Sequence, residues 1–241
     1  MRVLLLGGTA EGRELAKALH PQVDIVSSLA GRVPDPALPV GPVRVGGFGG
    51  VDGLRNWLQD ERIDAVVDAT HPFASTMTAH AALVCAELAV PYLVLARPPW
   101  DPGPASVVAS NTDAAEHVVH EGFSRVFLTT GRSGIRAFVG CDAWFLIRAV
   151  TAPAGDTLPR HHHLVLSRGP FRYDDEAKLM IEHRIDVLVT KNSGGDMTRA
   201  KLDAAAALGI AVVMVARPEL PRGVTAVGTV AEAAQWVEGL C

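Results

Sequence analysis

The segment Gly7-Gly8-Thr9-Ala10-Glu11-Gly12-Arg13 follows a short apolar run and has the composition of a phosphate-binding loop. Its glycines would let a ligand approach the backbone, and the free N–H groups at the start of a following helix would attract an anion. The spacing is G-G-x-x-x-G and not the G-x-G-x-x-G of dinucleotide-binding proteins, so a tight turn without a ligand is the alternative interpretation.

The next apolar run ends in Ser27 and Ser28, followed by a turn that contains Gly31 and Arg32. No acidic side chain stands there to accept hydrogen bonds from ribose hydroxyls, whereas an arginine suits a ribose 2′-phosphate. This pattern favours NADPH over NADH, the alternative being that Arg32 is an ordinary surface arginine.

The segment from Asp68 to Ala74 places a carboxylate, the Thr70 hydroxyl and the His71 imidazole at the end of a third apolar run. His71 has the right chemistry to donate a proton near neutral pH, or it caps the turn through its own hydrogen bonds. Asp68 is either an acid or a group that orients its neighbours. Pro72 fixes the backbone, and a helix is expected to begin near Ser75.

Two later segments, Thr129–Gly134 and Lys191–Asp196, each set a cationic side chain beside glycines and hydroxyls. We expect them to receive anionic groups of a substrate, unless they are solvated loops with ordinary turn residues. The run His161–His163 is interpreted as loop surface with no metal, because adjacent strand positions face opposite ways and no Cys, Asp or Glu cluster joins them.

Eight apolar runs with little alternation predict strands buried on both faces of parallel sheets, and amphipathic segments between them predict crossover helices. The predicted strands are Val3–Leu6, Val23–Ser28, Ile63–Ala69, Tyr92–Ala96, Arg125–Thr129, Ala143–Val150, Ile185–Thr190 and Ile210–Ala216. Acidic residues 174–176 are expected to open one helix, and Thr229 is expected to cap the last one. The predicted class is α/β.

An internal repeat divides the chain into two similar halves. Arg62-Ile63-Asp64 returns as Arg184-Ile185-Asp186, and Ala96-Arg97-Pro98 returns as Ala216-Arg217-Pro218. We therefore expect two Rossmann-like lobes with parallel sheets, residues 1–122 and 123–241, with a ligand-binding cleft between them. An alternative within this division is that the last strand–helix unit of each half crosses over to the other lobe. Shared βαβ patterning without duplication is the alternative.

Composition excludes several classes of protein. A net charge of −4 at pH 7 argues against general nucleic-acid binding. The first apolar run is too short for a signal peptide, and no stretch is long enough to span a membrane, so a cytoplasmic protein is expected. Three dispersed cysteines favour neither disulfides nor zinc.

Taken in order and spacing, these loops resemble the precorrin-6A reductase family of cobalamin (vitamin B12) biosynthesis. Asp68-Ala69-Thr70-His71-Pro72-Phe73-Ala74 together with Lys191-Asn192-Ser193-Gly194-Gly195 is the most specific part, and the resemblance runs over essentially the whole chain. It implies an oxidoreductase that uses NADPH to reduce one carbon–carbon double bond of precorrin-6A, giving precorrin-6B, or acts on the cobalt-bearing analogue.

On this resemblance, the first lobe binds NADPH and the second binds the carboxylate-rich tetrapyrrole. The expected cofactor-binding residues are Gly8, Thr9, Ala10, Ser28, Gly31, Arg32 and Thr70. The expected substrate-binding residues are Arg132, Ser133, Lys191, Asn192, Ser193, Gly194 and Gly195. His71 and Asp68 are the candidate catalytic residues.

Two other functions fit a two-lobed α/β protein. One is a transferase or lyase acting on a sugar nucleotide or another tetrapyrrole, because a fold alone does not determine chemistry. The other is an NADP(H)-responsive regulator, for which the acidic balance of the chain gives little support.

Overall fold

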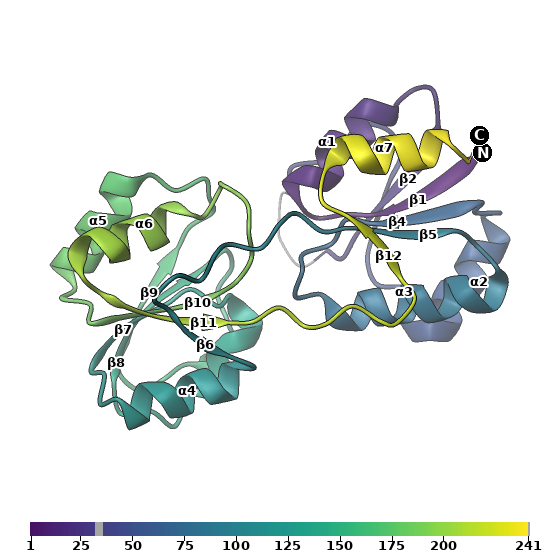
Figure 1. Cartoon of the computed structure of the whole chain (residues 1–241). Coiled ribbons are helices and arrows are strands. Elements are labelled where there is room, and N and C mark those ends of the chain that lie inside the picture. Colours follow the sequence, from purple (N-terminus) through teal and green to yellow (C-terminus); the bar gives the residue numbers. More distant parts are fainter. Residues whose placement is uncertain (32–35, 241) are drawn as a thin grey trace. The chain divides into compact units, whose positions relative to one another are not determined.

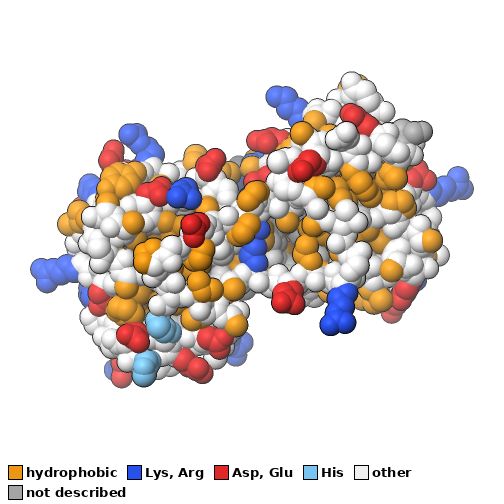
Figure 2. All heavy atoms as spheres, in the orientation of Figure 1, with side chains coloured by type: hydrophobic (Ala, Val, Ile, Leu, Met, Phe, Trp, Pro, Cys, Tyr) orange, Lys and Arg blue, Asp and Glu red, His pale blue; other side chains and the backbone are white. Residues whose placement is uncertain are grey.

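The structure is a computed structural model that describes residues 1–31 and 36–240 (Figure 1). It consists of two compact units. The first unit comprises Met1–Pro98 together with the chain from Pro218 onward, and the second comprises Pro99–Arg217. On the face drawn in Figure 2, basic and acidic side chains are interspersed and not gathered by sign.

The first unit is a parallel sheet of six strands with helices on both faces. Its strands are β1 (Arg2–Leu6), β2 (Asp24–Leu29), β3 (Val43–Val45), β4 (Ala65–Asp68), β5 (Tyr92–Leu95) and β12 (Thr225–Val227), and its helices are α1 (Ala10–Leu19), α2 (Gly50–Asp60), α3 (Ser75–Leu88) and α7 (Val230–Glu238). The order is β12-β5-β4-β1-β2-β3.

Alternate residues of β1 build the two halves of this unit's core, because successive side chains of a strand face opposite ways. Val3 and Leu5 pack in one cluster with residues of α1 and α7, and Leu4 and Leu6 pack in another with residues of α2 and α3. Both faces of the sheet are therefore apolar, which explains the unbroken apolar runs in the sequence.

The second unit repeats this architecture. Its strands are β6 (Ser106–Val108), β7 (Arg125–Leu128), β8 (Trp144–Ala149), β9 (His162–Leu166), β10 (Val187–Lys191) and β11 (Ala211–Val215), and its helices are α4 (Asn111–His120), α5 (Tyr173–Glu182) and α6 (Ala200–Leu208), with short 3-10 segments at Arg132–Phe138 and Gly155–Thr157. The order is β6-β11-β10-β7-β8-β9, again with parallel pairings. The predicted α/β class with two parallel sheets is confirmed.

The repeated sequence motif makes the same contact in both units. The carboxylate of Asp64 accepts a hydrogen bond from the backbone N–H of Arg2 at 2.7 Å, and the carboxylate of Asp186 accepts from the backbone N–H of Arg125 at 3.0 Å. Each aspartate ties the start of one central strand to its neighbour. The two halves thus share structural detail beyond a common βαβ pattern.

The two halves exchange their last strand and helix. β6 pairs with β11 in the second unit, and β12 pairs with β5 in the first. The expected lobes, 1–122 and 123–241, therefore differ from the two compact units. β6 and α4 belong to the second unit, and β12 and α7 belong to the first. The crossover that we allowed for each half accounts for this difference.

The central strands, the helix that begins at Ser75 and the Thr229 cap follow the predictions. Thr229 and Glu232 form a reciprocal capping box at the start of α7. The run His161–His163 lies on the surface as expected, but His162 and His163 belong to the edge strand β9 and not to a loop. There the ring of His163 stacks on that of His183, with centroids 5.5 Å apart.

Within the described residues, every helix is too short or too polar to cross a membrane. The same part of the chain contains no group of three His, Cys, Asp or Glu side chains placed to hold a metal ion.

Candidate functional site

The strand order places a topological switch point in each sheet. In the first sheet β2 and β3 lie on one side of β1, and β4 and β5 lie on the other. The loops that follow β1 and β4 therefore leave the sheet in opposite directions and flank a crevice, where open α/β sheets bind ligands. The corresponding switch point of the second sheet lies between β7 and β10. Four of the five predicted loops lie at these two switch points.

Thr9 joins the two loops at the first switch point. Its side chain is the N-cap of α1, accepting a hydrogen bond from Gly12 N at 3.1 Å, and its hydroxyl donates to the carbonyl oxygen of Ala69 at 2.7 Å. A single buried threonine therefore starts the helix and fixes the distance between the loops that follow β1 and β4. Ala10 is the first residue of α1.

The glycines of the first loop have distinct roles. Gly8 has a φ of 116°, and a Cβ atom there would meet no atom within 4 Å, so its backbone faces open space. A Cβ atom on Gly12 would lie 3.4 Å from Ala69 Cβ, an ordinary van der Waals contact, so α1 runs close to the start of the loop after β4.

A small hollow opens beside these glycines, lined by Leu5, Gly7, Gly8, Gly12, Arg13, Ser27, Leu29, Ala37 and Pro39. Ser27 is fully buried, and its Oγ has no hydrogen-bond partner among the described residues. A buried hydroxyl without a partner is costly, so this atom is a ready donor for a bound ligand or water.

A cation that the sequence did not predict lies beside the end of β2. Ser28 Oγ accepts a hydrogen bond from Arg44 of β3 at 3.2 Å, because these two residues are paired in the parallel ladder. Gly31 follows with a φ of 67°. Arg32, the predicted phosphate ligand, lies outside the described residues.

Asp68 is buried, and both of its carboxylate oxygens accept hydrogen bonds. Its Oδ1 accepts hydrogen bonds from the backbone N–H of Thr70 at 2.9 Å and from the Thr70 hydroxyl at 2.6 Å. Its Oδ2 accepts from the Thr78 hydroxyl at 2.7 Å and from the Tyr92 hydroxyl at 2.9 Å. Burial, together with the Asp68 carboxylate, raises the pKa of Tyr92, so the phenol remains a donor. This geometry suits an orienting carboxylate.

His71 is exposed in the turn that Asp68 orients. Its Nδ1 accepts a hydrogen bond from the backbone N–H of Phe73 at 3.2 Å. When the ring is neutral, this bond places its proton on Nε2. The turn-capping interpretation applies to the neutral ring. Proton donation starts from the protonated ring, in which Nδ1 carries a proton and does not accept from the Phe73 N–H, so the two interpretations describe different protonation states of the same side chain.

At the second switch point, the loop after β7 contains Arg132 and Ser133, both exposed, at the start of a 3-10 segment. Arg132 donates to the Thr151 hydroxyl at 3.3 Å. Gly134 behind them is tightly packed, because a Cβ atom there would lie 2.6 Å from Thr130 Oγ1 and 2.7 Å from Asn111 Oδ1.

The loop after β10 begins with Lys191, whose pKa is lowered by partial burial. The carboxamide of Asn192 accepts from the backbone N–H of Trp100 at 2.8 Å and donates to its carbonyl oxygen at 3.0 Å. Gly194 and Gly195 both have positive φ, at 66° and 73°. The Ser193 N–H bonds to the Lys191 carbonyl at 2.7 Å, so it is not an open donor.

Comparisons with known proteins identify the family. Residues 2–238 match the family model described as Precorrin-6x reductase CbiJ/CobK. The chain belongs to this family. It is 74% identical to precorrin-6A reductase of Mycobacterium tuberculosis over 99% of this chain and 98% of that protein. It is 54% identical to precorrin-6A reductase of Rhodococcus erythropolis over 98% of this chain and 97% of that protein.

A solved structure of CobK precorrin-6A reductase matches with a TM-score of 0.90 and 36% identity, over 99% of this chain and 96% of that one. Membership of the precorrin-6x reductase family makes the chain an oxidoreductase of cobalamin biosynthesis, which decides against the transferase, lyase and regulator alternatives.

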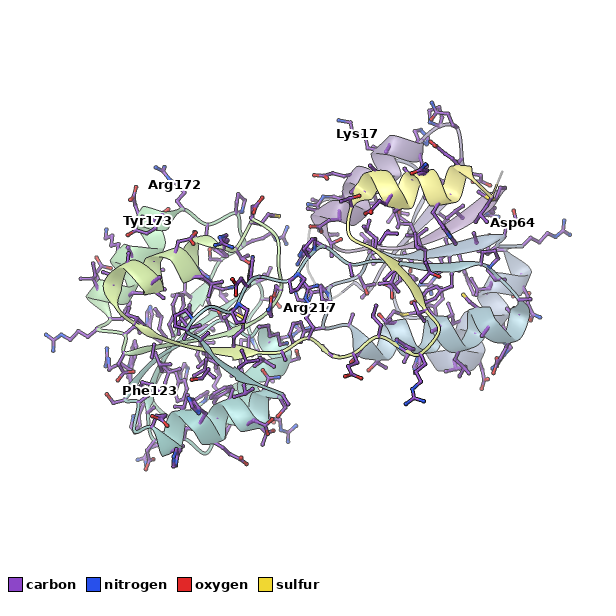
Figure 3. All side chains as sticks on the ribbon, in the orientation of Figure 1. Lys17, Asp64, Phe123, Arg172, Tyr173 and Arg217 are labelled. Atoms are coloured by element: carbon purple, nitrogen blue, oxygen red, sulfur yellow. The ribbon has the colours of Figure 1, made fainter. Side chains whose placement is uncertain are left out.

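In this family member, the repeated Ala-Arg-Pro motifs anchor the loops of each unit. Arg97 pairs with Glu11 of the first loop at 2.8 Å. Arg217, labelled in Figure 3, donates to the carbonyl oxygens of Asn192 at 2.8 Å and Ser193 at 3.0 Å. The sequence repeat marked both arginines, but their partners are distant in sequence and emerge only from the fold.

The second unit also contains a buried cluster of charged side chains that the sequence did not predict. Arg148 of β8 forms an ion pair with Glu176 of α5, and Lys201 of α6 is buried over the ring of Trp100, 5.2 Å from its centroid. The indole N–H of Trp100 donates to the Gly195 carbonyl oxygen at 2.9 Å. The cluster therefore supports the loop after β10 through Trp100.

Proposed function

We propose that this member of the precorrin-6x reductase family uses NADPH to reduce a carbon–carbon double bond of precorrin-6A, giving precorrin-6B. The relatives of M. tuberculosis and R. erythropolis are named for that substrate. The observation that carries the NADPH assignment is the first switch point, where a glycine loop and the N-terminus of α1 meet the loop after β4.

The first unit fits a dinucleotide. The open backbone at Gly8 and the N–H groups at the start of α1 suit a pyrophosphate, with Thr9 and Ala10 at the helix start. The buried Ser27 hydroxyl, which has no partner within the described residues, Ser28 near the end of β2, and Gly31 just after that strand suit the adenosine side of the nucleotide. Thr70 stands on the other side of the switch point, where the nicotinamide is expected.

The second unit is assigned to the tetrapyrrole. Arg132 and Lys191 follow adjacent strands of the sheet and have the charge to bind acetate and propionate groups, with Ser133 beside the arginine. Asn192 and the carbonyls of Ser193 and Gly195 are engaged internally, so we assign them to shaping the loop. Gly194 gives that loop its turn.

The reaction adds a hydride and a proton across the double bond. Bound NADPH supplies the hydride, and the protein contributes positioning and exclusion of water. We assign the proton to the protonated His71 ring, which gives up its Nε2 proton and becomes neutral. Asp68 holds Thr70 and the start of this turn in place.

The test is anaerobic turnover of purified precorrin-6A, following loss of NADPH absorbance and formation of precorrin-6B by mass. We expect one NADPH consumed per tetrapyrrole, with a mass gain of two hydrogens. NADPH binding without turnover would contradict the substrate assignment. Turnover that proceeds equally well with NADH would contradict the cofactor assignment and leave the reductase activity standing.

A further inference from the structure

Arg44 presents a guanidinium group at the end of β2, the place where a Rossmann-like fold binds the adenosine ribose. Its Nη1 donates to Ser28 Oγ at 3.2 Å and to the Gly46 carbonyl oxygen at 2.6 Å, and its Nη2 donates to the Gly47 carbonyl oxygen at 2.7 Å. These three acceptors hold the group in one orientation.

An aromatic platform supports the same group. The guanidinium carbon of Arg44 lies 3.9 Å from the centroid of the Phe48 ring, and the Trp57 ring packs edge-on against Phe48. Gly53 makes this arrangement possible, because a Cβ atom at that position would lie 1.7 Å from the Phe48 carbonyl oxygen. The position of the cation is therefore built into the fold.

This cation has no negative partner among residues 1–31 and 36–240. No described carboxylate lies within ion-pair distance of Arg44, and all the printed acceptors are neutral oxygens. Partly buried charges are normally paired, so an oriented arginine with neutral partners points to an anionic ligand. Other arginines of this unit, such as Arg55 and Arg97, do pair with carboxylates.

We propose that Arg44 binds the 2′-phosphate of the adenosine ribose in NADPH and so sets the preference for NADPH over NADH. The inference rests on the proposed NADPH dependence. The side chain of Arg44 is already oriented by Ser28 and supported by Phe48.

The experiment measures dissociation constants of NADPH, NADH, 2′,5′-ADP and 5′-ADP for the unmodified chain, Arg44→Gln, Arg44→Lys and Arg32→Gln. Arg55→Gln is the matched control, since Arg55 lies on α2 of the same unit and pairs with Asp52 and Glu87 at the surface. We expect Arg44→Gln to weaken NADPH and 2′,5′-ADP by about 10- to 100-fold, with NADH and 5′-ADP changed by less than about threefold. Arg44→Lys should keep part of the preference.

The outcomes separate the inference from the proposed function. If the unmodified chain prefers NADPH and Arg44→Gln keeps that preference, or weakens NADPH and NADH equally, the role of Arg44 is overturned while NADPH dependence stands. If the unmodified chain shows no preference, both are overturned. If Arg44→Gln unfolds, Arg44→Lys decides. A preference for NADPH that is reduced, with NADH binding unchanged, supports the inference, and NADPH and NADH affinities that change by the same factor refute it.

Discussion

In the neutral ring of His71, Nδ1 accepts a hydrogen bond from the Phe73 N–H and Nε2 carries the proton. If His71 protonates the reduced tetrapyrrole, His71→Gln should lower kcat by about 100- to 10,000-fold with little change in NADPH affinity. His120→Gln, on the exposed surface of α4, is the control. Steady-state turnover together with nucleotide binding checks this. Full turnover in His71→Gln would assign the proton to another group and leave His71 as a turn cap.

Lys201 is a lysine whose ammonium group is buried in the second unit. Burial, and secondarily the nearby Arg148, lower its pKa to about 7, although Glu176 acts in the opposite direction. Near pH 7 the unfolded chain binds more protons than the folded chain at this site, so the free energy of unfolding should rise as pH increases from about 7 toward 10.

Replacing Lys201 by Met removes the cost of burying the ammonium group and leaves the Arg148–Glu176 pair intact. We expect the free energy of unfolding near pH 7 to increase by about 1–4 kcal/mol, less the lost contact of the ammonium with Trp100. The rise with pH should also flatten. Urea unfolding near pH 7 and near pH 9 measures both effects, with Lys178→Met on the surface of α5 as control. A variant less stable than its parent would mean that the ammonium is net stabilising.

At the scale of elements, Thr9 couples the start of α1 to the loop after β4 through one hydroxyl. Thr9→Val keeps the size of the side chain and removes both hydrogen bonds, so it should lower the free energy of unfolding by about 1–3 kcal/mol and weaken NADPH binding. Thr9→Ser keeps the hydroxyl and should retain most of both. Chemical denaturation and nucleotide titration check this pair. Unchanged stability and binding in Thr9→Val, with losses in Thr9→Ser, would show that the methyl group matters and the hydroxyl does not.

The central strands were predictable because each is buried on both faces and reads as an unbroken apolar run. The edge strands β3, β6, β9 and β12 were not, since their side chains are all exposed or half-exposed. The loops at strand ends were recognisable from glycines and charges. Arg44 was not, because its significance comes from its ladder pairing with Ser28, and such a pairing is set by the tertiary fold.

At the scale of the whole molecule, each unit is completed by a strand and helix from the other half of the sequence. β12 covers the edge of the first sheet beside β5, and α7 contributes the fully buried Ala233 and Val237 to the core cluster that contains Leu15 and Leu19 of α1. The first unit thus depends on the last segment of the chain, whereas the second unit is complete by Arg217.

Ending the chain after Arg217 should therefore affect the two units unequally. The first unit would expose the edge of β5 and the apolar face that α7 covers, so its amide protons in β1, β4 and β5 should lose hydrogen-exchange protection. Strands β7, β8 and β10 should keep theirs, because the second unit retains all of its strands. Hydrogen exchange with mass spectrometry, compared with the full chain, measures this directly. Equal loss in both units would mean that they unfold as one cooperative body, and no loss in the first would mean that α7 and β12 are dispensable to its core.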